Sequence, residues 1–360
     1  MYMKRLSALL ICACLLLSGC SSLFSGSYYH TEPHLHSGSG TESGNISASN
    51  YAGLCHALVT MVENGTQSGI ISVPDYDQNR LQADIDRAIT DTLSTSPIAA
   101  WAVETINCEI GSSGGQSAIA VNITYLHDRA EIRRIRRADS LEAAKAIIHE
   151  VLDECGTGVV MLMQNFQDTD FEQLVEDYAD ISPQTVMECP QVVANVYPDN
   201  GDSRLVELKF TYQTSRDSLR SMQTQVRSVF ESAAVYVSGY EQESEKFRQL
   251  YAFLMEFLVE GDYKQETSIT PAYSLLRHGV GNEKAFATVY AAMCKEAGLE
   301  CRVIIGTRSG EPWYWNQICI DGVYSHLDLL RCSKNGKFQT YPDDKMDGYV
   351  WDYSAYPVSE

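Results

Sequence analysis

The stretch from Gly279 to Asp328 carries the side chains best suited to chemistry. Glu283 stands at the beginning of a helical pattern, and His326 and Asp328 lie at the end of a later strand-like segment. Two carboxyl groups at a defined separation can cleave a glycosidic bond, one acting as acid and the other as base or nucleophile. A hydrolase that uses Glu283, assisted by Asp328 or His326, is therefore one hypothesis for this chain.

Cysteine thiols are a second source of chemistry. Eight of them lie beyond residue 20, at Cys55, Cys108, Cys155, Cys189, Cys294, Cys301, Cys319 and Cys332. An even number permits disulfides outside the cytoplasm, and none of the spacings is the CxxC typical of zinc sites. The sequence does not fix any pairing. A thiol enzyme stays open as an alternative, and it would need a cysteine of low pKa near His278 or His326.

Hydrophobic periodicity predicts the elements around these residues. One buried helical stripe recurs at Phe286, Val289, Tyr290, Met293 and Ala297, and Gly298 follows as a stop signal. Residues 301–305 are β-branched and apolar, and side chains alternate over residues 313–318 and 324–328, which indicates three strands. A helix N-terminus that faces such strands would bring Glu283, Trp313 and Asp328 together in an α+β domain.

The order of these motifs closely resembles the bacterial transglutaminase-like family. The family's Gly-x-Cys-x-x-Tyr/Phe-Ala compares with residues 281–287, its His-Ala-Trp-Asn with residues 313–316, and its Asp-Gly-x-Trp/Tyr with residues 321–324. The resemblance covers roughly 240–360 and implies a papain-like fold. A strongly apolar helix over 243–259 leads into it, and the closing segment near residues 346–357 is also similar.

The same comparison implies that two catalytic residues are replaced. The cysteine position falls on Glu283, the histidine position falls on Trp313, and only the third residue, Asp328, is retained. A carboxylate is a poor nucleophile toward an amide, and an indole N–H cannot accept a proton. We therefore expect a pseudoenzyme with no intact catalytic set, no cofactor and no metal. A possible groove for a peptide, glycan or protein would be lined by Trp313, Tyr314, Trp315, Asn316 and His326.

The N-terminus predicts an exported, lipid-anchored protein. Lys4 and Arg5 precede an apolar run, residues 6–17, which is too short to span a bilayer but typical of a signal-peptide core. Residues 17–20, Leu-Ser-Gly-Cys, resemble the lipobox of bacterial lipoproteins, which implies cleavage after residue 19 and acylation of Cys20. Stable anchoring to the bilayer needs two or more acyl chains.

A tether and an acidic ectodomain are expected to follow. Residues 20–50 are rich in Ser and Gly and lack apolar periodicity, so we interpret His30, His34 and His36 as solvated linker residues rather than metal ligands. Loss of Lys4 and Arg5 leaves 25 Lys and Arg against 47 Asp and Glu, a net charge near −22. This balance argues against nucleic acid as a partner.

The region from 51 to 240 is interpreted as a duplication ahead of a transglutaminase-like domain over 241–360. Alternating strands at 119–125 and 206–212 are offset by 87 residues, and each lies behind a Gly-containing turn, at 111–115 and 198–201. Helical patterns at 81–89 and 171–178 come before the hairpins. Short apolar strands, 159–163 and 234–237, are expected after them. The predicted unit is α-β-β-α-β, seen twice over about 80–165 and 168–240.

Overall fold

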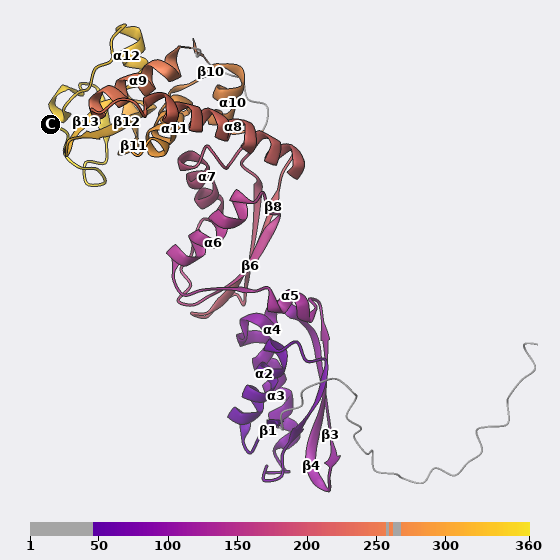
Figure 1. The fold of residues 1–360 in the computed structure, drawn as a ribbon. Helices are drawn as coiled ribbons and strands as arrows, with labels where there is room; N and C mark the ends of the chain where they lie inside the picture. Colours follow the sequence, from indigo (N-terminus) through magenta and orange to yellow (C-terminus); the bar gives the residue numbers. More distant parts are fainter. Residues whose placement is uncertain (1–45, 257–258, 262–267) are drawn as a thin grey trace, which may run out of the picture.

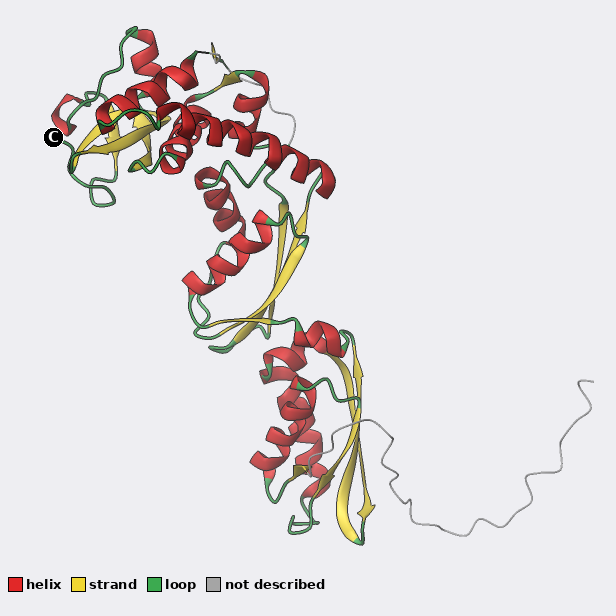
Figure 2. Cartoon of the chain, in the orientation of Figure 1, coloured by secondary structure: helices red, strands yellow, loops and turns green. Residues whose placement is uncertain are grey.

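The computed structural model describes residues 46–256, 259–261 and 268–360 of the chain. Two small αβ units and a C-terminal domain follow one another along an elongated molecule (Figure 1). In each αβ unit the helices lie on one side of a sheet, whereas the C-terminal domain gathers several helices beside its own sheet (Figure 2). The predicted signal peptide, residues 1–19, and most of the predicted tether lie outside the described residues.

The first unit is a four-stranded sheet with three helices. Its elements are β1 (Ile46–Ser47), α2 (Tyr51–Glu63), β2 (Ser68–Ser72), α3 (Leu81–Thr95), α4 (Pro97–Ala102), β3 (Val103–Ser113) and β4 (Gln116–Tyr125). The strand order is β1-β2-β4-β3, with β1 and β2 parallel and the other pairs antiparallel. Gly114 and Gly115 both adopt positive φ at the β3–β4 turn, which confirms the hairpin expected there.

The second unit repeats this arrangement. After the short helix α5 (Arg129–Arg133) come β5 (Arg136–Ala138), α6 (Leu141–Asp153), β6 (Gly158–Met163), α7 (Phe171–Ile181), β7 (Gln191–Tyr197) and β8 (Arg204–Thr211). The strand order is β5-β6-β8-β7, again with one parallel pair followed by two antiparallel pairs. The offset strands of the sequence comparison, β4 and β8, occupy the same place in the two sheets.

The shared unit is β-α-β-α-β-β, which differs from the predicted α-β-β-α-β. The predicted repeats, about 80–165 and 168–240, begin at α3 and α7. Each predicted repeat therefore omits the parallel strand pair with which the observed unit begins. The expected strand at 234–237 is wrong, because these residues form the last turn of a long helix. A common origin of the two units by duplication stays a prediction.

The end of the predicted tether is structured. Ile46 and Ser47 pair in parallel with Ile71 and Ser72, and the side chain of Ala48 is 3% exposed. Asn50 caps α2 by accepting a hydrogen bond from the backbone N–H of Gly53. Apolar side chains in a Ser-rich stretch are thus sufficient to add an edge strand, and the fold begins by Ile46 rather than after residue 50.

The C-terminal domain is built from helices and one antiparallel sheet. Its helices are α8 (Arg216–Val237), α9 (Glu243–Met255), α10 (Pro271–His278), α11 (Glu283–Glu296), α12 (Leu329–Lys334) and the 3-10 turn η1 (Asp343–Lys345). Its strands are β9 (Val259–Glu260), β10 (Val280–Gly281), β11 (Cys301–Arg308), β12 (Glu311–Ile320), β13 (Val323–Leu327) and β14 (Tyr349–Trp351). The main sheet has the order β13-β12-β11-β14, and the helix and strands expected from periodicity over 286–327 are confirmed.

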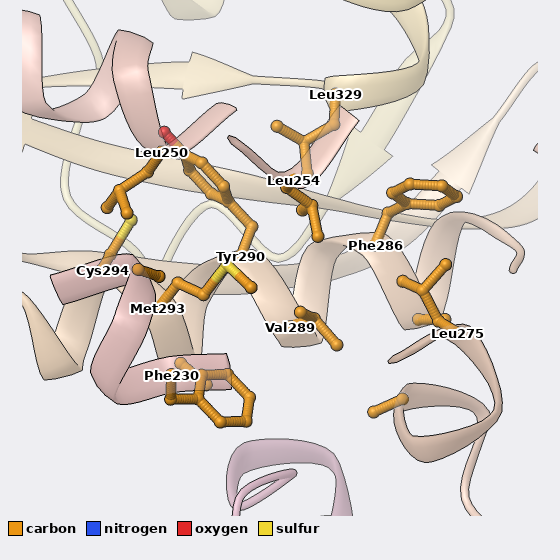
Figure 3. Close-up of a cluster of buried hydrophobic side chains, with 14 of the residues drawn as sticks. Phe230, Leu250, Leu254, Leu275, Phe286, Val289, Tyr290, Met293, Cys294 and Leu329 are labelled. Carbon is orange, nitrogen blue, oxygen red and sulfur yellow. The ribbon is translucent and has the colours of Figure 1, made fainter. Parts of the chain in front are cut away.

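The helix α11 is the centre of the domain's core. Its predicted stripe is buried, with Phe286, Val289 and Tyr290 at 0% exposure, and Phe230, Leu250 and Leu254 surround it (Figure 3). The hydroxyl of Tyr290 donates to the carbonyl of Phe247 at 2.7 Å.

The helix α8 belongs to this core as well. Leu219, Val226 and Phe230 pack in the same cluster as α11, so the C-terminal domain begins with α8 and not at the expected boundary near 240. The short apolar run at the end of α8 resembled a strand, but only Val237 continues the buried helical stripe, whereas Val235 and Tyr236 are 73% and 48% exposed. In the described part of the chain, no helix is both long and apolar enough to cross a bilayer.

Candidate functional site

Glu283 lies in the first turn of α11. The side chain of Asn282 caps this helix by accepting a hydrogen bond from the N–H of Ala285 at 3.1 Å. Unpaired N–H groups and the positive end of the helix dipole favour a carboxylate at this position. Glu283 is half-buried, and among the described residues its carboxylate has no hydrogen-bond or ion-pair partner.

Asp328 is a buried carboxylate that interacts with four other residues of the domain. It is 1% exposed and follows directly after β13, where its Oδ1 accepts from the N–H of Arg331 at 2.9 Å and caps α12. Its Oδ2 accepts from the indole Nε1 of Trp313 at 3.0 Å and from the hydroxyl of Tyr349 at 2.6 Å. Arg308 lies 3.4 Å from the same oxygen. A buried carboxylate is stable only with such a set of donors and a cation.

Trp313 is hydrogen-bonded to Asp328 through its indole N–H. Its Nε1–H donates to the retained acid, and the guanidinium of Arg308 lies 5.0 Å from the centre of a Trp313 ring. Unlike an imidazole, the indole offers no second nitrogen to accept a proton. The structure therefore places Trp313 and Asp328 together, as the family comparison predicts.

Glu283 and Asp328 line one narrow cavity between α11 and the sheet. This space is partly open to solvent and amounts to about 150 Å³, and no part of it is wide enough for a water molecule. Trp315 and Asn316 also line it, but they are 1% and 0% exposed. Beside Glu283 and Asp328 the described residues thus leave no room for a ligand.

His326, Trp315 and Asn316 are structural residues in the core. The Nε1–H of Trp315 donates to Nδ1 of His326 at 3.0 Å, and Nε2 of the same imidazole donates to Asp343 at 2.8 Å. Burial of this 0% exposed ring lowers the pKa of His326 below its ordinary value, although Asp343 opposes the shift. The hydrogen bonds thus hold a neutral imidazole that is committed to Trp315 and Asp343 instead of to Glu283. Asn316 donates from its amide to the carbonyl of Ala287 at 2.9 Å and ties β12 to α11.

The described cysteines are free thiols, and several of them have a raised pKa that makes them poor nucleophiles. All eight cysteines beyond residue 20 are unpaired in the structure. Burial raises the pKa of Cys108, Cys189 and Cys332 to about 11, and it raises the pKa of Cys294 well above the ordinary value. Across the described ranges, no group of three or more His, Cys, Asp or Glu side chains is placed to hold a metal ion.

Arg308 and Tyr349 are site residues that the sequence comparison missed. Tyr349 stands in the closing segment that resembles the family, and Arg308 ends the strand β11, but neither spacing indicates a bond to Asp328. They meet because β14 pairs with β11 in antiparallel register, with Tyr349 opposite Arg308. The pairing of β14 is therefore the signal that would have identified both.

The hydroxyl of Tyr349 gives a direct test of the Asp328 network. Tyr349→Phe removes one donor from a buried carboxylate, and we expect it to lower the free energy of unfolding by about 1.5–3 kcal/mol. Urea denaturation followed by circular dichroism measures the change. Tyr353→Phe is the control, because Tyr353 is 61% exposed, and it should change stability by less than about 0.5 kcal/mol. Equal effects of the two substitutions would contradict the network.

A comparison with protein families matches the C-terminal part of the chain. The family model of the transglutaminase-like superfamily matches residues 231–342, a range that begins inside α8 and includes Glu283, Trp313 and Asp328. No curated protein sequence matches the chain significantly.

Solved structures similar to this chain carry related descriptions. A transglutaminase structure is 10% identical with a TM-score of 0.26 and is matched over 60% of this chain and 62% of its own. A candidate cysteine protease from Cytophaga hutchinsonii is 13% identical, with a TM-score of 0.27 over 47% and 70% of the two chains. A candidate protease from Parabacteroides distasonis is 10% identical, with a TM-score of 0.25 over 72% and 39%. On the family match, the C-terminal part of this chain is a domain of the transglutaminase-like superfamily.

Proposed function

We propose that this protein is an extracytoplasmic lipoprotein whose transglutaminase-like domain has lost catalysis and acts by binding or assembly. The observation that carries the proposal is the hydrogen bond from Trp313 to Asp328. In the family this acid orients a catalytic histidine, and here an indole occupies its oxygen. A histidine acts as general base through an acceptor nitrogen, which indole lacks.

The nucleophile position supports the same conclusion. Glu283 has the place in the first turn of α11 at which a thiolate would benefit from the helix N-terminus. A carboxylate is stabilised there equally well, so the scaffold can retain its geometry without the thiol chemistry. The narrow space beside Glu283 is too small for a water molecule and so has no room for an acyl substrate.

The alternative hydrolase has less support. Glu283 and Asp328 line the same cavity, which favours a pair of carboxylates, but Asp328 is already bound by Trp313 and Tyr349, and His326 is bound elsewhere. A displaced cysteine nucleophile is disfavoured for the deeply buried thiols, because a raised pKa leaves little thiolate at neutral pH. The activity test below decides between the proposal and a thiol enzyme or a peptide hydrolase that uses Glu283.

Loss of catalysis predicts background activity only. The purified protein should neither incorporate a fluorescent amine into casein nor hydrolyse casein above the level of a buffer blank, with an active transglutaminase as the positive control. Removing either the nucleophile or the base of such a catalytic set costs orders of magnitude in rate. A robust activity that disappears on cysteine alkylation, or in Glu283→Gln, would overturn the proposal and identify the group responsible.

Membrane attachment follows from the lipobox-like residues 17–20. We expect the wild-type protein to partition with membranes and to carry acyl chains on Cys20, because two or more chains give stable anchoring. Cys20→Ala should lack the acyl chains and leave an uncleaved or released protein. Fractionation and mass spectrometry of the N-terminal peptide measure both properties. Recovery of wild type and variant in the same soluble fraction would contradict lipid anchoring.

A further inference from the structure

The strand β11 has a free edge over its first half. On one side it pairs with β12 along its whole length, but on the other side β14 covers only Gly306, Thr307 and Arg308. In the described part of the chain, the segment 301–305 therefore has no strand beside it on that side.

The free edge presents unpaired main-chain groups. The carbonyl of Glu300 accepts from the N–H of Cys319 on the β12 side, and alternate residues of a strand bond to opposite sides. The N–H and C=O groups of Cys301, Val303 and Ile305 thus point away from β12. Among the described residues only one of these groups is engaged, the N–H of Ile305, which lies 3.5 Å from the hydroxyl of Tyr356.

A groove of about 640 Å³ runs along this edge. One wall is α11, the other is α7 of the second unit, and these two helices contact each other (Figure 1). Ile181 at the end of α7 and Ile305 on β11 line the groove and remain 62% and 55% exposed. Exposed apolar side chains beside unpaired strand edges are the features that a partner strand covers.

Two carboxylates of the groove are paired with cations, whereas a third, Asp177, keeps its negative charge. Asp180 pairs with Lys284 at 2.9 Å and Glu300 pairs with Arg302 at 2.7 Å. Asp177 accepts a hydrogen bond from Gln173 at 2.9 Å. Lys295, in the last turn of α11, is exposed and has no partner among the described residues, so it is the cation available to a ligand.

We propose that this groove binds an extended peptide segment of a partner protein, which adds a strand to the free edge of β11. Main-chain hydrogen bonds to Cys301 and Val303 hold the peptide, and its alternate apolar side chains contact Ile181 and Ile305. An antiparallel strand that continues the direction of β14 runs from Ile305 toward Cys301. The C-terminal end of the peptide then lies near Lys295, and an acidic group there pairs with this lysine.

The free edge of β11 lies within a recessed groove, which admits a single peptide but not the edge of a second copy of this chain. The free edge lies behind α7, and the equivalent edge of another copy has the same wall in front of it. The proposal names the partner class for the binding function proposed above and rests on that function. It concerns a different place from the narrow space beside Glu283.

The test uses the purified full chain in detergent and a phage-displayed library of random twelve-residue peptides. We expect enriched peptides with alternating apolar residues and an acidic C-terminal side. In hydrogen exchange, a synthetic copy of an enriched peptide should protect the segment 299–306. Val303→Pro removes a main-chain N–H that is not hydrogen-bonded to β12, and proline is tolerated at such positions of edge strands. Because a bound peptide would lose this donor, the substitution should weaken binding about tenfold. Val303→Thr keeps the N–H and the side-chain shape, and should bind within about twofold of wild type.

A second variant keeps the test decisive if Val303→Pro does not fold. Ala291→Trp fills the groove from α11 without changing β11, and it should also weaken binding about tenfold. Peptides that bind both variants as tightly as wild type, no enrichment over empty phage, or dimers of the chain that Val303→Pro disrupts would each overturn the proposal. If no peptide binds and the activity test shows only background activity, the peptide site alone is wrong. If a peptide binds and the protein is catalytically active, only the proposed loss of catalysis is wrong.

Discussion

The buried carboxylate of Asp328 is the constraint on which the C-terminal sheet and its helices depend. It begins α12 through Arg331, fixes Trp313 on β12 and Tyr349 on β14, and lies beside Arg308 at the end of β11. A charge this deeply buried is tolerated only while its donors remain in place. The acid therefore has a structural role that does not depend on any catalytic function.

The C-terminal domain also depends on the second αβ unit. Cys155 and Met187 of that unit are part of the core formed by α8, α9 and α11. Glu188, 1% exposed, accepts from the N–H groups of Gln213 and Thr214 and from the hydroxyl of Ser268, which joins β8, α8 and the segment before α10. The ion pair of Asp180 with Lys284 also joins α7 to α11, and the wall of the peptide groove is one consequence.

Local patterns predicted much of the fold, because helices and strands with one buried face leave a periodic signal. The stripe on α11 and the alternation along β12 are of this kind. The end of α8 was predicted wrongly, since four apolar residues in succession fit a strand as well as a helix. The bonds of Asp328 to Arg308 and Tyr349 were beyond the sequence, because they depend on the register of β14 against β11 across more than 40 residues of chain. The narrowness of the space beside Glu283 likewise depends on packing between α11 and the sheet.

The central claim is that Glu283 and Trp313 occupy the nucleophile and base positions of a transglutaminase-like scaffold, with Asp328 in place behind them. The double variant Glu283→Cys and Trp313→His tests it directly. Mass spectrometry of the peptide containing residue 283 follows alkylation by iodoacetamide against pH. A thiolate is favoured at a helix N-terminus beside an imidazolium, so the introduced thiol should react faster in the folded protein than in urea, and at lower pH. A thiol that reacts no faster folded than unfolded would show that the two positions do not face each other, and the account of the site would be wrong.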